Sequence, residues 1–324
     1  MNLSKEQNDA VGFYDQHYSI VFDSELTVGR HIKLADQQGI EDRICRFCGL
    51  GKPNVTFRKV AHAVPEFLGN KSLVSQNECD ACNEKLADEY EDHLSKWFGP
   101  MRTVSQIRGK GGVPTYKNKD IRIEMGEKGL EIGIIGEELE SSLNFDGPFT
   151  FKIPVPTPAQ AHVPLRAAKA LLKVACSICP PELLSECQPT IEWLMSRVNA
   201  SLSMFPVLFA FTPGPNPYCD GKVFLLRRKS DAKLPFLWCI LATANYRFQF
   251  FVPFCPSDTW ITPGEPVELT PPHFPDVFGD KWPHGKTGFG VFDWSGTEPV
   301  VREQSVSFNV DSVEKVDIKP DSEN

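Results

Sequence analysis

The sequence has no run of about 18 consecutive apolar residues, which excludes an ordinary transmembrane helix. Its first residues, Met1–Asp9, are polar and lack the apolar core of a secretory signal. Internal repeats are also missing, which excludes a solenoid. We therefore expect a cytoplasmic protein without membrane contact, in which thiols stay reduced.

An excess of positive charge is missing as well. The 324 residues carry 34 Lys and Arg against 42 Asp and Glu, a net charge of −8, which is not typical of a nucleic-acid-binding protein. The charge is uneven, however: residues 41–120 hold 13 basic and 11 acidic residues, a net of +2, and the rest of the chain carries −10. This mildly basic segment coincides with the motifs described below.

What is present favours a globular protein of more than one domain. Hydrophobic residues make up 41% of the chain and charged residues 23%, ordinary values for a protein with a buried core. We expect an N-terminal helix and strand extension in residues 1–40, a first domain in 41–120, an accessory domain in 121–310 and a flexible acidic tail in 311–324. A hairpin is predicted at Ile121–Ile134, and a stiff linker at Pro154, Pro156 and Pro158.

Four of the ten cysteines form two C-x-x-C pairs. Cys45 and Cys48 are separated by 30 residues from Cys79 and Cys82, a spacing that can supply four thiolates to one tetrahedral zinc ion. Residues 41–100 contain many charges and few large apolar side chains, so a structural zinc would supply part of their folding energy. The alternatives are two unrelated buried pairs or a redox-active pair.

Between the two pairs lies a histidine followed by proline and glycine, and an asparagine follows the last cysteine. The order Cys45/Cys48, His62/Pro65/Gly69, Cys79/Cys82/Asn83 resembles the HNH endonucleases, and especially their endonuclease VII-like and bacterial groups. The resemblance covers about 70 residues, from Cys45 to about Gly112. It implies a ββα-metal fold, with Asn83 opening a helix over Glu84–Trp97.

The resemblance also implies phosphodiester hydrolysis. His62 would be the general base that takes a proton from water, a task suited to an imidazole that titrates near neutral pH. Asn83 would bind a catalytic Mg²⁺ or Mn²⁺ ion, which would stabilise the leaving 3′-oxygen. An asparagine between the motifs would orient the histidine, and Asn77 and Asn70 are the candidates.

One position departs from the family pattern. The residue before the histidine is usually an acid or histidine that binds the catalytic metal, and here it is Ala61. Glu66, four residues after His62, is the first candidate to replace it. Glu91 and Asp92 follow, although both fit a solvated helix face better, and His93 beside them is expected at the surface. If none reaches the metal, the segment is a nuclease-derived binding module.

A basic, glycine-rich segment follows the predicted helix. Arg102, Arg108 and Lys110 could neutralise DNA phosphates there, while the glycines let the backbone approach closely; the alternative is a flexible surface loop. Nothing in the segment resembles a base-reading helix. We therefore expect contacts mainly with the DNA backbone and little sequence specificity.

The C-terminal half predicts an antiparallel sheet with helices packed on one face. An amphipathic helix is expected at Val163–Cys179, and a second at Thr190–Val198, opened by Pro189. Four strands are expected between 205 and 254. The six remaining cysteines are predicted to be buried thiols: Cys176, Cys179, Cys187, Cys219, Cys239 and Cys255.

The fold class expected from these features is α+β: a ββα-metal domain with structural zinc and an accessory domain of antiparallel sheet and helices. The leading hypothesis is a metal-dependent HNH DNA endonuclease. Proteins of this two-part form resemble effectors of bacterial anti-phage defence, which implies activation by a signal, a homo-oligomer or a partner protein. The alternative is a zinc-dependent nucleic-acid or protein-binding module in which Ala61 marks lost catalysis.

Overall fold

The computed structural model describes residues 4–27, 29–36, 39, 42–109, 111–118, 121–127, 129–134, 150–155, 160–196, 204–261, 271–275, 282–302 and 304–309. No helix in these ranges is long and apolar enough to cross a membrane. The elements mix helices with largely antiparallel sheets, which confirms the α+β class.

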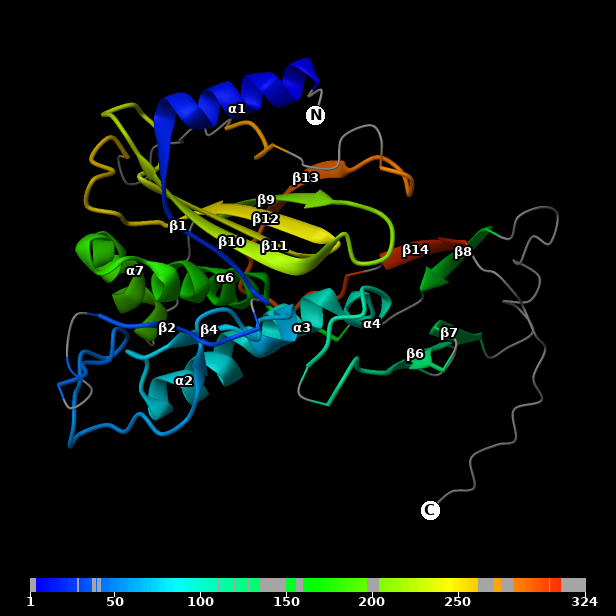
Figure 1. Cartoon of the computed structure of the whole chain (residues 1–324), viewed down its shortest axis with the longest axis horizontal. Coiled ribbons are helices and arrows are strands. Elements are labelled where there is room, and N and C mark those ends of the chain that lie inside the picture. The colour runs from blue at the N-terminus through cyan, green and yellow to red at the C-terminus, as the bar shows by residue number, and fades with distance from the viewer. Residues whose placement is uncertain are drawn as a thin grey trace.

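A six-stranded antiparallel sheet forms the centre of the molecule, in the order β1-β10-β11-β12-β9-β13 (Figure 1). Its strands are β1 (Tyr18–Glu25), β9 (Pro206–Phe211), β10 (Tyr218–Arg228), β11 (Leu237–Ala244), β12 (Tyr246–Phe251) and β13 (Gly288–Asp293). The four strands predicted between 205 and 254 are confirmed as β9 to β12. Strand β1 comes from the N-terminal 40 residues and pairs with β10.

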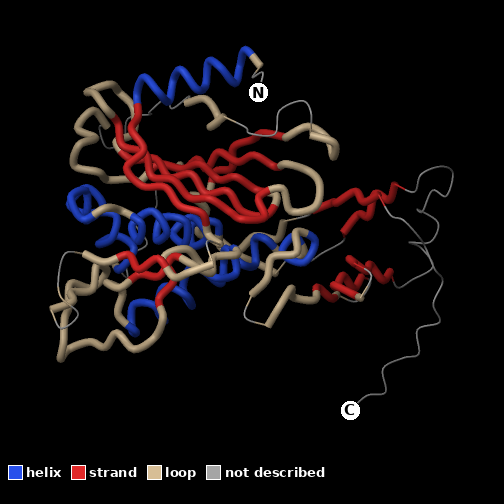
Figure 2. The backbone as a smooth tube through the Cα atoms, in the orientation of Figure 1, coloured by secondary structure: helices blue, strands red, loops and turns tan. Residues whose placement is uncertain are grey.

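Helices cover both faces of this sheet, whereas the sequence predicted only one covered face (Figure 2). Helix α1 (Lys5–His17) begins at Ser4, whose side chain forms a capping box with Gln7. Tyr14 and Tyr18 from this N-terminal segment are buried in one cluster with Trp238 of β11. Because both faces are covered, every residue of β11 is buried.

Helices α6 (Pro164–Ile178) and α7 (Leu184–Met195) lie on the other face of the sheet, with a short 3₁₀ turn, η3 (Pro181–Leu183), between them. Helix α6 confirms the predicted amphipathic helix, and because other helical segments also pack against it, every residue except Arg166 is buried. The predicted start of α7 is wrong. Pro189 lies inside this helix, where burial of Cys187 and Ile191 offsets the hydrogen bond that proline cannot donate.

A small ββα unit packs below α6 (Figure 1). It contains β3 (Ala61–His62), the 3₁₀ turn η1 (Glu66–Leu68), β4 (Leu73–Ser75), α2 (Asp80–Leu86), a π-helical turn η2 (Ala87–Glu91) and α3 (Asp92–Phe98). Strand β2 (Ile32–Leu34) runs parallel to β4 and completes a three-stranded sheet. The predicted helix exists but begins earlier, with Cys79 as its N-cap, so Asn83 lies in its first turn rather than before it.

The remaining elements are short. Helix α4 (Met101–Val104) precedes a sheet of β5 (Tyr116–Lys117), β6 (Ile121–Gly126) and β7 (Gly129–Ile134), which confirms the predicted hairpin. Strand β8 (Thr150–Val155) pairs with β14 (Gln304–Asn309) and contains Pro154 of the expected linker. Pro156, Pro158 and the acidic tail lie outside the described residues.

One buried cluster extends from the ββα unit into the large sheet. It includes Leu86, Trp97 and Phe98 together with Leu171 and Phe248. Because this cluster is continuous across both parts, it does not locate a boundary between them, and the expected domain boundaries stay a prediction. Five of the six C-terminal cysteines are buried as expected, but Cys219 is exposed on β10, in the stretch between Tyr218 and Lys222 where the pairing with β11 is irregular.

Candidate metal centre and histidine site

The four cysteines of the two C-x-x-C pairs converge on one point. The Sγ atoms of Cys45, Cys48, Cys79 and Cys82 all lie within 4.8 Å of one another. The Sγ atoms of Cys48 and Cys79 are 3.8 Å apart, close to the spacing of about 3.8 Å that Zn–S bonds of about 2.3 Å give in a tetrahedron. The donor set and its geometry fit a structural zinc ion.

The local backbone favours a thiolate at Cys45, whereas burial and the neighbouring Cys45 raise the pKa of Cys79. The backbone N–H of Cys79 donates to Cys45 Sγ at 3.4 Å. A hydrogen bond from Cys82, together with backbone N–H groups, lowers the pKa of the Cys45 thiol to about 5. Gly49, just after the first pair, has a φ of +69°, a left-handed conformation that glycine adopts at little cost. The turn therefore presents both sulfurs of this pair to the same centre.

Asn77 braces the loops around the first cysteine pair. Its Oδ1 accepts from the Asp36 backbone N–H at 2.9 Å, and its Nδ2 donates to the Ile44 carbonyl at 3.1 Å. These bonds hold β2 against the cysteine turn and do not involve His62. The catalytic role predicted for Asn77 stays a prediction, and its observed contacts are structural.

His62 lies on β3, opposite Val74 of β4. Side chains alternate along a strand, so Ala61 points into the core, where it is 2% exposed, while the His62 side chain is 22% exposed. A metal-binding side chain at position 61 would follow the buried direction in this backbone. A small apolar residue therefore suits this buried position, although the family pattern has a metal ligand there.

Glu66 places a carboxylate close to the histidine. Its Oε2 atom lies 4.0 Å from His62 Nε2, and its Oε1 atom accepts from Lys71 Nζ at 2.8 Å. The 3₁₀ turn η1 after Pro65 folds this carboxylate back toward β3. Glu66 was the first candidate to replace the missing ligand, and its position fits that role. The metal-ligand assignment itself stays a prediction.

Asn70, the other candidate for orienting the histidine, is fully occupied inside the same loop. Its Nδ2 donates to the carbonyls of Val64 and Leu73, and its Oδ1 accepts from the backbone N–H groups of Ser72 and Leu73. Two donors and two lone pairs are thereby satisfied. Asn70 fixes the shape of the loop that carries Glu66.

Asn83 is half-buried in the first turn of α2, one residue after the last cysteine. The strand of His62 is tied to this helix start by Asp80, whose carboxylate accepts from the backbone N–H groups of Arg58 and Lys59. Lys59 also pairs with Glu84 at 3.1 Å. The segment leading into β3 is therefore anchored beside the first turn of α2, as a ββα arrangement requires.

The two other candidate carboxylates have different partners. Asp92 pairs with Lys96 at 2.6 Å on the surface. Glu91 contacts Lys173 of α6 at 3.2 Å. The buried Glu78 contacts the same lysine at 3.3 Å, and burial raises the pKa of Glu78 to about 7. This buried charge group was missed by sequence reasoning, because its members come from distant segments.

His93 was expected at the surface but is bound to α6. Its Nδ1 accepts from the Val163 backbone N–H at 3.0 Å, which caps the start of that helix. Burial and the neighbouring Arg166 guanidinium lower the pKa of His93. The neutral ring is therefore the form that the fold requires.

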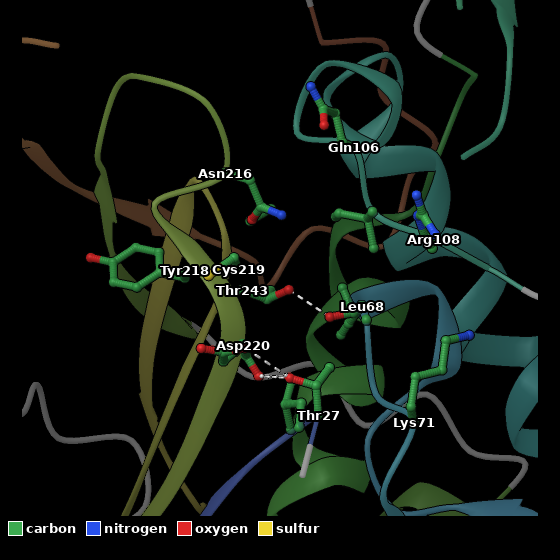
Figure 3. A pocket seen from close by; sticks show the side chains of 15 residues that line it. Thr27, Leu68, Lys71, Gln106, Arg108, Asn216, Tyr218, Cys219, Asp220 and Thr243 are labelled. Carbon is green, nitrogen blue, oxygen red and sulfur yellow. Dashed lines mark hydrogen bonds between the residues drawn. The ribbon is translucent and has the colours of Figure 1, made fainter. Parts of the chain in front are cut away.

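The described residues among the predicted DNA contacts have different surroundings. Arg102 is half-buried, donates to Ser95 Oγ at 3.0 Å and lies 5.3 Å from the centre of the Phe67 ring, so its contacts are internal. Lys110 lies outside the described residues. Arg108 is exposed and lines a cavity of about 340 Å³ together with Lys71. Figure 3 shows both basic side chains on one side of the cavity and Asn216 facing it from the strand side.

Lys71 is a basic residue that sequence reasoning missed. It lies on the loop after Gly69, which closes the 3₁₀ turn with a φ of +91°. The sequence offered one signal for this residue. It is a lysine two residues after the motif glycine, in the loop between the histidine and the second cysteine pair. Its ion pair with Glu66 links the cavity to the histidine site.

Comparison with protein families identifies the segment that carries this geometry. Residues 45–99 match the family model described as HNH endonuclease. Comparison with curated proteins and with solved structures gives no match. The resemblance stated from the motifs is confirmed, and it contains the cysteine cluster, His62, Glu66 and Asn83.

Proposed function

We propose that this chain, whose residues 45–99 form an HNH endonuclease domain, is a metal-dependent endonuclease that hydrolyses phosphodiester bonds of DNA. The observation that carries the proposal is the carboxylate of Glu66 beside His62 on a ββα unit held by four cysteines. That carboxylate supplies an oxygen ligand where Ala61 cannot.

His62 acts as the general base in this proposal. Its imidazole takes the proton from the attacking water, and its partial exposure leaves room for water and phosphate on the solvent side. Glu66, 4.0 Å away, stabilises the imidazolium that this transfer produces. Lys71 holds the other oxygen of Glu66 and thereby fixes the carboxylate.

Glu66 and Asn83 would hold the catalytic Mg²⁺ or Mn²⁺, because carboxylate and amide oxygens suit hard divalent cations. When bound, such an ion neutralises the scissile phosphate and stabilises the leaving 3′-oxygen. A zinc ion bound by the four cysteines would hold the cysteine turn against the start of α2 and would take no part in the reaction.

DNA is bound mainly through its backbone. Arg108 and Lys71 are the described basic residues on the cavity next to the histidine loop, and each would contact a phosphate without reading a base. The net charge of −8 leaves little long-range attraction for DNA. We therefore propose that full activity requires a partner protein, a signal or a homo-oligomer, as in an effector of anti-phage defence.

Plasmid cleavage with and without Mg²⁺ or Mn²⁺ tests the nuclease proposal. We expect metal-dependent nicking or linearisation by the wild type and a loss of at least about 100-fold in His62→Ala. Equal cleavage by both proteins in every metal would exclude His62 as the base. Tight DNA binding without any cleavage, also in a lysate that contains the native partners, would favour the binding-module alternative that Ala61 suggests.

A further inference from the structure

Helix α6 of the C-terminal half is held by the HNH segment at both of its ends. At its start, His93 accepts the Val163 N–H. At its end, the Arg46 guanidinium donates to the carbonyls of Cys176 and Cys179 at 2.9 and 2.8 Å. Arg46 lies between the first two zinc-binding cysteines. The helix is thus fixed in position relative to the metal centre.

Lys173, in the middle of α6, connects the helix to the histidine strand. Its Nζ donates to the His62 carbonyl at 2.6 Å. It also contacts Glu78 Oε2 at 3.3 Å and Glu91 Oε1 at 3.2 Å. An ammonium group has three protons, and three acceptors surround this one. The Lys173 side chain is 1% exposed, so these partners take the place of water.

The three acceptors belong to the three parts of the ββα unit that must be aligned. His62 is on β3, Glu78 precedes the zinc ligand Cys79, and Glu91 ends the π-helical turn η2. π-Helical turns within helices are frequent at functional sites. Here the turn lies against α6, where Glu91 meets Lys173.

His62 needs such support because its own strand is short. Strand β3 contains only two residues, Ala61 and His62, and is paired with β4 alone. A ladder of this length fixes a backbone weakly. The charge-assisted bond from Lys173 holds the carbonyl of the same residue whose imidazole must be aligned for proton transfer.

We propose that Lys173 is a positioning residue of the nuclease, acting through the backbone of His62, so that the C-terminal half completes the catalytic centre. The proposal rests on the proposed function of His62 as general base. It assigns α6 a direct part in the reaction geometry, beyond regulation or recruitment.

Helix α6 offers a matched control one turn earlier. Lys169 is 1% exposed, and its Nζ lies over the rings of Trp193 and Tyr90, at 4.4 and 5.2 Å from their centres. Lys169→Met and Lys173→Met therefore remove the same charge from the same buried helix. The second change alone removes the bond to His62, and with it the contacts to Glu78 and Glu91 that complete the same group.

The test uses the full-length, zinc-loaded protein in the plasmid assay with Mn²⁺ or Mg²⁺. We expect Lys173→Met to lower kcat at least tenfold with KM for DNA within twofold of wild type, and Lys169→Met to lower kcat by less than threefold. In a His62→Ala background, Lys173→Met should leave the residual rate unchanged. A further multiplicative loss there would show a general structural role and overturn the proposal.

Hydrogen–deuterium exchange of the same variants, without DNA, provides a readout independent of activity. We expect faster exchange in the peptide that contains residues 60–64 for Lys173→Met but not for Lys169→Met. Unchanged exchange overturns the positioning role even when the wild type cleaves DNA. A wild type that cleaves no DNA while this exchange difference is present refutes the function of His62, and with it the catalytic part of the proposal.

Discussion

The contact between the zinc turn and helix α6 makes a strong prediction about stability. Arg46 donates through Nε and Nη2 to the Asp36 carboxylate and through Nη1 to three carbonyls at the end of α6. The Arg46 side chain is 5% exposed and that of Asp36 16%. If these bonds are removed, little water can therefore reach the groups to take their place. Arg46→Met should therefore destabilise the protein strongly.

The size of the effect follows from burial. Removing one partner of a buried ion pair costs about 3–5 kcal/mol, because the other charge is left unpaired. The α6 carbonyls that lose a charged donor belong to residues that are at most 1% exposed, so their loss adds to this cost. We expect a total loss of about 4 kcal/mol, which corresponds to a decrease in Tm of roughly 6 °C for a chain of this length.

Urea unfolding of the zinc-loaded protein measures this free energy, and elemental analysis of each variant separates it from zinc loss. Arg58→Met is the control, because Arg58 is an exposed arginine of the same segment, and we expect a change within about 0.5 kcal/mol. Arg46→Met combined with Asp36→Asn should cost less than the two single changes added together. A loss below about 1 kcal/mol in Arg46→Met with zinc retained would refute the reasoning.

Three further outcomes are expected. Elemental analysis should find one equivalent of zinc in the wild type, and Cys79→Ser should lose it together with most of the soluble yield, since a three-cysteine site leaves the fold without its metal; full zinc content in this variant would contradict the four-cysteine centre. Arg108→Gln should reduce the slope of log Kd for DNA against log salt by about 1, and an unchanged slope would place the phosphate contact elsewhere. The folded pKa of His93 lies below its ordinary value of 6.5, so its contribution to stability is present above pH 6.5 and is lost as the pH falls toward the folded pKa. His93→Gln should weaken the fall in unfolding free energy between pH 7.5 and 5.5, and identical pH profiles for both proteins would contradict this.

Most of the confirmed predictions came from the spacing of residues that lie close together in the sequence. Two cysteines separated by two residues place their sulfurs on one turn regardless of the rest of the fold, so the metal centre at Cys45 and Cys79 was readable from the sequence. The strands from β9 to β12 were readable for a similar reason, since dense apolar runs bounded by proline and glycine favour buried strands. The start of α2 was misplaced because Cys79, a weak N-cap by residue type, takes that position.

The candidate site was readable only in part. The position of His62 between the cysteine pairs and the i, i+4 spacing of Glu66 indicated a pair, which the 3₁₀ turn brings to 4.0 Å. The roles of Asn70 and Asn77 could not be distinguished from the sequence. Asn77 binds the backbone at residues 36 and 44, and Asn70 binds the backbone at residue 64. These partners are brought to the amides by the folding of the loops, which the sequence pattern does not show.

The sequence by itself determined the four cysteines of the metal centre, the histidine motif and the α+β class, because each depends on residues close together in the chain. Only the tertiary structure decided that α6 belongs to the histidine site. Lys173 and His62 are 111 residues apart in the sequence, and neither segment carries a pattern that names the other. A buried ammonium is stable only where the fold surrounds it with acceptors or aromatic rings, so its partners are fixed by packing rather than by local sequence.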